Sequence, residues 1–128
     1  MCDVTPPGEL TLPTDERAPG VARHFLVGAS CHTHHARVLD EAELLVSELV
    51  TNAVVHGTPP ITVHIECDGS QGLAVAVSDG SPDLPEPRDA GPYAEGGRGI
   101  HLVDLISDRW GIEPREGDGK QVWFRLHA

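Results

Sequence analysis

The segment over about residues 33–56 constrains the fold more than any other, because it has the apolar spacing of one long helix. Five aliphatic residues recur there at the helical period: Leu39, Ala42, Val46, Leu49 and Ala53. This spacing places them along one side of the helix. Gly57 supplies a C-terminal stop, and the Thr58-Pro59-Pro60 segment prevents the helix from continuing. The sequence therefore predicts a helix of about seven turns.

Shorter patterns on both sides of this helix predict the remaining elements of one α+β domain. A helix is expected from Thr14 or Asp15, either of which can cap it, to about Ser30. Strands are expected at 9–12, 61–65, 73–77, 110–114 and 121–126, a third helix at 99–106, and turns at 68–72 and 116–119. This order predicts a two-layer α/β sandwich with a mixed, mostly antiparallel sheet, covered on one face by about three helices. Residues 1–8 are expected to form a flexible leader before a domain over 9–128.

Composition and charge exclude several classes of function. The 128 residues carry a formal net charge of −11, and such a field repels phosphate backbones and anionic lipid, so direct nucleic-acid and membrane binding are not expected. The three cysteines form no metal-like pair, and the sequence has no apolar run of membrane-spanning length. The segment from Met1 to Pro6 lacks the basic and apolar regions of a signal peptide, so none is expected. A cytoplasmic location is predicted.

Three polar side chains interrupt the apolar surroundings of the long helix. Glu48, Asn52 and His56 are spaced four residues apart, so they project from one side of it. A carboxylate and a carboxamide one turn apart supply oxygens suited to Mg²⁺ and to activating a hydroxyl or water. A solvated polar stripe explains the same spacing equally well, and this segment alone does not decide between the two.

The second polar feature is the abrupt end of an apolar strand in Asp79-Gly80. An aspartate at this position can accept a hydrogen bond from an exocyclic amine such as that of adenine. Taken alone, the pair is better explained as a turn.

The third is the glycine turn Gly97-Arg98-Gly99 leading into Ile100 and an apolar helix. Glycine N–H groups and a helix N-terminus can hold a phosphate chain, with Arg98 nearby. The turn is neither a Walker loop nor a dinucleotide fingerprint, because no Gly-Lys-Ser/Thr follows and no strand leads directly into it. A further loop over 79–95, rich in proline and without periodicity, is predicted to be a lid.

In this order, the segments 48–56, 79–82 and 97–100 resemble the N, G1 and G2 boxes of the histidine kinase-like (Bergerat-fold) ATPases, over about residues 10–127. More narrowly, the chain looks like the stand-alone relatives of the anti-sigma-factor serine/threonine kinases, whose ends resemble 108–111 and 119–124. This resemblance implies ATP and Mg²⁺ as ligands, and a sigma factor and an anti-anti-sigma factor as protein partners. Relatives of this kind often pair as homodimers.

The resemblance also implies roles for individual residues. Glu48 would be the catalytic base and Asn52 the Mg²⁺ ligand. Asp79, followed by Gly80, would recognise the adenine amine. The phosphates would lie against Gly97, Arg98, Gly99 and Ile100, with His56 near the phosphate end.

The chain departs from the family's commonest G1 box, since Ser81 and Asp83 replace two glycines, and its lid is short. Three hypotheses therefore stay open: a kinase, a nucleotide-sensing binding module without chemistry, and an adaptor that has kept only the fold. The Cys31, His32, His34 and His35 cluster lacks a second set of metal ligands and is interpreted as an exposed polar junction. Trp110 and Trp123 are interpreted as structural, as core aromatics on adjacent strands.

Overall fold

A computed structural model of the protein describes residues 8–29, 38–67, 72–81, 102–115 and 119–127. Its long elements follow one another in the order β1 (Gly8–Leu12), α1 (Ala18–Ala29), α3 (Leu39–His56), β2 (Ile61–Cys67), β3 (Gly72–Asp79), β4 (Arg109–Pro114) and β5 (Lys120–His127). Residues 102–106 form a further short helical segment. Within these ranges each predicted helix and strand is present, although the two long helices begin later than predicted.

The five strands form one sheet in the order β1-β2-β3-β5-β4. All four pairings between them are antiparallel. The two predicted hairpins, β2–β3 and β4–β5, are both present, and β5 pairs with β3, so that the second hairpin extends the sheet built by the first. The α+β sandwich expected from the order of elements is confirmed.

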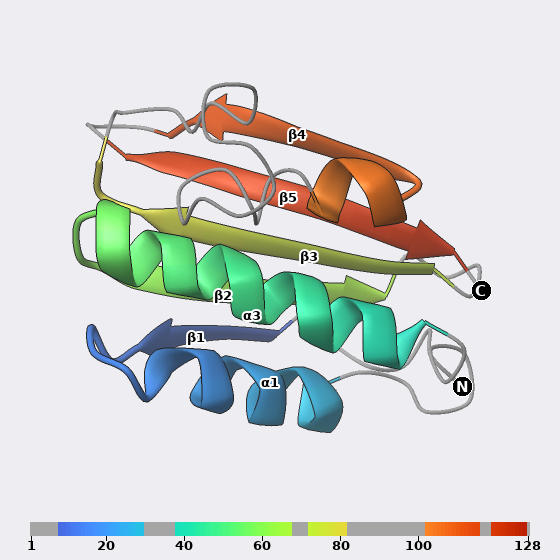
Figure 1. Ribbon diagram of the computed structural model, residues 1–128, viewed down its shortest axis with the longest axis horizontal. Coiled ribbons are helices and arrows are strands. Elements are labelled where there is room, and N and C mark those ends of the chain that lie inside the picture. The colour runs from blue at the N-terminus through green and yellow to red at the C-terminus, as the bar shows by residue number, and fades with distance from the viewer. Residues whose placement is uncertain (1–7, 30–37, 68–71, 82–101, 116–118, 128) are drawn as a thin grey trace.

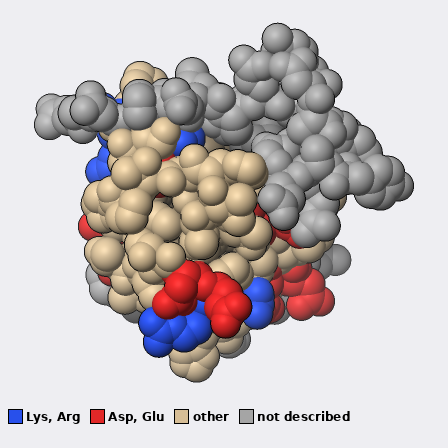
Figure 2. Space-filling view, turned by 60° about the vertical axis from the view of Figure 1, so that its left-hand side comes forward, with Lys and Arg blue, Asp and Glu red and all other residues tan. Residues whose placement is uncertain are grey.

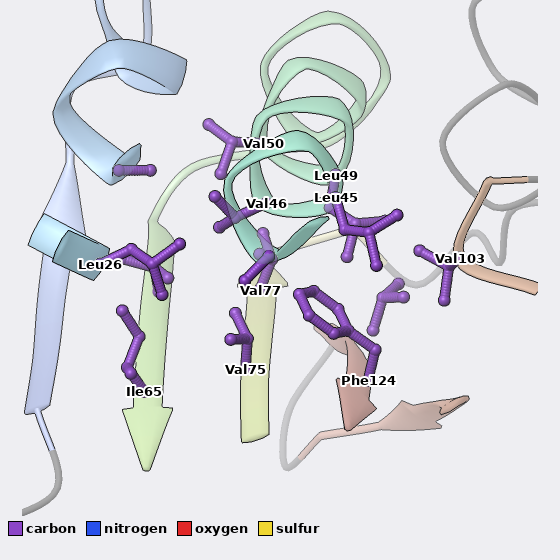
Figure 3. Close-up of a cluster of buried hydrophobic side chains, with 14 of the residues drawn as sticks. Leu26, Leu45, Val46, Leu49, Val50, Ile65, Val75, Val77, Val103 and Phe124 are labelled. Carbon is purple, nitrogen blue, oxygen red and sulfur yellow. The ribbon is translucent and has the colours of Figure 1, made fainter. Parts of the chain in front are cut away.

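The helices lie on one face of this sheet (Figure 1). One apolar core joins α1, α3 and the 102–106 segment to alternate residues of the strands, as expected when side chains on a strand point alternately to its two faces. Figure 3 shows Val75 and Val77 of β3 beneath α3, with Leu26 of α1 on one side and Phe124 of β5 on the other. The core is therefore aliphatic, with Phe124 as its largest fully buried side chain.

Both long helices begin later than the sequence predicts. The Asp15 carboxylate accepts the backbone N–H of Arg17 at 2.9 Å, and α1 follows at Ala18. Hydrogen bonds from Arg17 hold the pKa of the Asp15 carboxyl below its usual value. In α3, Val38 precedes the helix without a side-chain cap, and Asp40 and Glu41 occupy the first turn, where negative charge stabilises the helix end. The start predicted at about residue 33 was therefore wrong: the described helix begins at Leu39, where its apolar spacing also begins.

The prediction for the two tryptophans was correct for one of them only. Trp110 packs against the core, and its indole N–H donates to Asp104 at 2.9 Å. Trp123 points to the opposite face of the sheet, because it alternates with the buried Val122 and Phe124 on β5. There it covers Gly111, where an added Cβ would meet the indole ring at 2.8 Å.

Candidate functional site

The candidate site begins at the carboxyl end of β3, where Asp79 faces the helical layer. Asp79 alternates with the core residues Val75 and Val77 and is buried. Its Oδ1 accepts the backbone N–H of Ser81 at 2.7 Å. This bond folds the chain back after the strand and holds the carboxylate in one orientation.

The C-terminal end of α3 packs against this carboxylate. A Cβ at Gly57 would lie 2.7 Å from both Cγ and Oδ2 of Asp79, which is too close for any side chain. The Gly80 N–H donates to the Thr58 carbonyl at 2.6 Å, and a Cβ at Gly80 would meet the Pro59 carbonyl oxygen at 2.7 Å. Glycine at both positions thus allows the helix end and the strand end to meet.

Lys120, the first residue of β5, forms a buried ion pair with Asp79. Its Nζ lies 3.0 Å from Oδ1 and 3.0 Å from Oδ2, and the two side chains are only 10% and 7% exposed. Lys120 was not among the predicted site residues. Two signals could have found it: Lys120 is the only lysine of the sequence, and strand alternation places it on the same face as Val122 and Phe124.

Glu48 and Asn52 lie on the side of α3 that faces the 102–106 segment. Leu45 and Leu49 point toward Val103 on that side of the helix (Figure 3). Glu48 and Asn52 each follow one of these leucines by three residues, so they lie beside them on the helix surface. Both side chains are half-buried, which excludes the fully solvated stripe that the sequence left open.

Asn52 carries an unusual feature for a residue packed in a helix. Its Nδ2 is buried and has no hydrogen-bond partner among the described residues. Such a group costs free energy unless something else accepts its hydrogen bond. A polar ligand, or a residue outside the described ranges, would satisfy it.

Of the predicted site residues not yet discussed, His56 alone lies within the described ranges. His56 is exposed at the end of α3. Gly97, Arg98, Gly99 and Ile100, as well as the Cys31 and His cluster, lie outside the described residues. Among the part of the chain that is described, no group of three or more His, Cys, Asp or Glu side chains could hold a metal ion.

A cavity of about 520 Å³ opens beside Asp79. Its lining includes Thr62 and Ser78, which alternate with core residues and therefore face away from the helices. The exposed Arg115 donates to Ser78 Oγ at 2.8 Å within this cavity. The cavity thus belongs to the uncovered sheet face, although it reaches the same strand end.

In Figure 2 the molecule is turned so that the ends of α3 and β3 come toward the viewer. Most of the described surface there is uncharged, and acidic and basic side chains gather at its lower edge. The charges of Asp79 and Lys120 add little to this surface because both side chains are buried.

Comparison with known proteins assigns the chain to a family. The profile of the histidine kinase-like ATPase domain matches residues 12–126, so the chain belongs to this family. The uncharacterized protein SCO4941 of Streptomyces coelicolor is 38% identical over 82 residues, which cover 60% of this chain and 76% of that protein.

A similar fold occurs in the solved structure of the RsbU and RsbW domains of Rv1364c from Mycobacterium tuberculosis. The TM-score is 0.67 over 96% of this chain at 19% sequence identity. This chain spans 32% of that longer one. The expected Bergerat-type architecture is confirmed by this likeness and by the family match. No helix among the described residues is long and apolar enough to cross a membrane.

The described residues fit the ligand that the family implies. The buried Nδ2 of Asn52 lacks a partner, and a side-chain amide also offers an oxygen of the kind that Mg²⁺ accepts. Asp79 is held as a buried acceptor at the end of the helix that carries Asn52. An ATP molecule with its base at Asp79 and its phosphates toward Asn52 would use both features.

Proposed function

We propose that this protein is an ATP-dependent serine/threonine kinase of the anti-sigma-factor type, which phosphorylates an anti-anti-sigma partner and holds a sigma factor inactive. Membership of the histidine kinase-like ATPase family supports ATP as the nucleotide. The resemblance of the sequence to anti-sigma-factor kinases supports the substrate class. The proposal places the protein in the cytoplasm and allows for a homodimer.

The observation that carries the proposal is the unpartnered amide of Asn52 on the helix whose end packs against the buried Asp79. A structural asparagine would be expected to have its buried N–H groups satisfied by the surrounding protein. A buried amide that no described residue satisfies, one turn beyond a carboxylate, is the arrangement expected of a residue that completes its contacts with a ligand.

Each residue has a distinct role in the proposed reaction. Asp79 accepts a hydrogen bond from the adenine amine, and Asn52 binds Mg²⁺, which when bound would neutralise charge on the phosphates. Glu48 takes the proton of a serine or threonine hydroxyl, whose oxygen then bonds to the γ-phosphorus as the bond to ADP breaks. The phosphate chain would lie against Gly97, Arg98, Gly99 and Ile100, with Gly80 near the base. His56, which the resemblance assigns to the phosphate end, precedes Gly57 at the end of α3 that contacts Asp79.

Transfer of labelled phosphate tests the proposal. The purified chain is incubated with Mg²⁺, ATP labelled at the γ-phosphate and a candidate anti-anti-sigma protein, and phosphoserine or phosphothreonine should form on the partner. Glu48→Gln should slow this transfer by about 10²-fold or more while ATP still binds. The absence of transfer to the partners tested, together with full control of a sigma factor by Glu48→Gln, would contradict the kinase assignment.

A second function, a nucleotide-sensing binding module without chemistry, is favoured by the contacts of the altered G1 segment. Ser81 is buried, and its backbone N–H donates a hydrogen bond to the Asp79 carboxylate. The same carboxylate accepts a hydrogen bond from Lys120. A carboxylate that protein contacts hold in one orientation suits the binding of a nucleotide without chemistry. In that case ATP and ADP would change the affinity for the regulator, and Glu48→Ala would leave this control intact.

A further inference from the structure

We propose that Lys120 is a specificity-determining residue of the nucleotide pocket: its ammonium donates a hydrogen bond to the ring nitrogen N1 of adenine, beside the amine that Asp79 accepts. This inference deepens the proposed function and rests on it. It gives a role to a buried cation that the proposed reaction does not use.

The strand register places the two charges side by side. Asp79 is paired with Lys120 at the end of the β3–β5 ladder, and both side chains point to the helical face of the sheet. Gly119 permits this close start of β5, because a Cβ there would lie 2.6 Å from the Asp79 carbonyl oxygen. Lys120 is therefore fixed next to the residue proposed to recognise the base.

The hydrogen bonds among the described residues leave this pair with capacity for a ligand. An ammonium has three N–H donors, and an ionised carboxylate has about four acceptor positions. Lys120 Nζ contacts both oxygens of Asp79, and Ser81 N–H takes a further position on Oδ1. The described residues leave one ammonium N–H and one carboxylate acceptor position unused, so the pair presents a donor next to an acceptor.

Adenine carries the complementary groups on adjacent atoms. Its exocyclic amine is a donor and the neighbouring N1 is an acceptor, so the amine matches Asp79 and N1 matches Lys120. In guanine a carbonyl oxygen replaces the amine and N1 carries a hydrogen. A guanine ring in the same orientation would place its carbonyl oxygen against the carboxylate and its N1–H against the ammonium. Buried polar groups would then be left unpaired, so the pocket should strongly reject guanine nucleotides.

Nucleotides altered at one ring atom test this contact in the unmodified protein. In 1-deaza-ATP a C–H group replaces N1, whereas 7-deaza-ATP keeps the whole edge that faces Asp79 and Lys120. Calorimetric titration in the presence of Mg²⁺ should give 1-deaza-ATP an affinity roughly tenfold or more below that of ATP, the size of one hydrogen bond that leaves a charged donor unpaired. The 7-deaza control should bind like ATP. Equal affinities for ATP and 1-deaza-ATP would overturn the proposal.

The variant Lys120→Met distinguishes two roles of Lys120: a direct contact with adenine N1, and an indirect role in which it only orients Asp79. If Lys120 contacts N1, ATP should bind roughly tenfold more weakly to this variant, and 1-deaza-ATP should then bind as well as ATP. If Lys120 only orients Asp79, both nucleotides should weaken equally and the penalty for 1-deaza-ATP should persist, which contradicts the proposal.

A second readout needs no variant, should Lys120→Met fail to fold. Because the sequence has one lysine, protein grown with ¹³Cε-labelled lysine gives a single lysine signal in NMR spectra. That signal should shift on addition of ATP and shift less with saturating 1-deaza-ATP. If wild-type protein binds no ATP at all, the proposed function fails along with this inference. If ATP binds and the signal responds identically to both nucleotides, only the role of Lys120 is refuted.

Discussion

Gly57 at the end of α3 and Asp79 at the end of β3 are in direct contact, so that any side chain at Gly57 would collide with the Asp79 carboxylate at 2.7 Å. The contact joins the helix that carries Glu48 and Asn52 to the strand that carries the proposed base-recognising residue. The relative positions of these residues therefore depend on a glycine that needs no unusual backbone angle, since its φ is −93°.

The variant Gly57→Ala tests this contact. The added methyl group should force Asp79 or the end of α3 to move, and overpacking of this kind costs about 1–3 kcal/mol of unfolding free energy. ATP affinity should fall as well, because Asp79 is displaced. Chemical denaturation and nucleotide titration measure the two effects.

Gly28→Ala is the matched control for that substitution. Gly28 lies within α1, is exposed, and has nothing within 4 Å of an added Cβ. Alanine should therefore stabilise the protein by roughly 0.5–1 kcal/mol and leave nucleotide affinity unchanged. A similar loss of affinity in both variants would show that the Gly57 contact is not specific.

Asn52→Leu should affect stability and binding in opposite directions. Leucine removes a buried amide that lacks a partner among the described residues, so the protein without nucleotide should become more stable by about 1 kcal/mol. The same change removes the proposed Mg²⁺ ligand and should abolish Mg-ATP binding. Loss of stability in Asn52→Leu would indicate that Asn52 is satisfied within the protein and has a structural role.

Thr51→Val serves as the neighbouring control. The Thr51 hydroxyl donates to the Ser47 carbonyl at 2.8 Å within α3, so its loss should have a small effect on stability. Nucleotide affinity should be the same as in the wild-type protein.

The Asp79 and Lys120 ion pair predicts strong coupling between two substitutions. Lys120→Met leaves a buried carboxylate without its cation and should cost about 3–5 kcal/mol of unfolding free energy. Asp79→Asn leaves a buried ammonium and should cost a similar amount. The double variant should be less destabilised than the sum of the two, and additive losses in denaturation experiments would refute the pairing.

The sequence predicted those parts of the structure that depend on local pattern. Apolar spacing predicted α3, and glycine-rich turns between apolar runs predicted both hairpins. Asp79 was predicted at a strand end because the apolar run stops there. The start of α3 was placed too early because the residues before Leu39 have no apolar spacing that would locate the first turn of the helix.

Two of the features missed depend on which elements are neighbours in space, and a third, the face on which Trp123 lies, was misassigned from a local pattern. Lys120 meets Asp79 only because β5 pairs with β3, a connection across 41 residues that no local pattern encodes. Trp123 was placed in the core because aromatic residues are usually buried, although its alternation with Val122 assigns it to the other face. The contact of Gly57 with Asp79 likewise required the packing of α3 on the sheet.

Titration with Mg-ATP tests most directly whether one nucleotide contacts both the end of β3 and α3. The proteins to compare are the wild type, Asp79→Asn and Asn52→Ala, with Thr51→Val as the control. We expect one site in the wild-type protein and in Thr51→Val, and an affinity at least about tenfold lower in each of the other two variants, corresponding to the loss of one or more polar contacts. No binding by the wild-type protein, or full affinity in both site variants, would contradict this account.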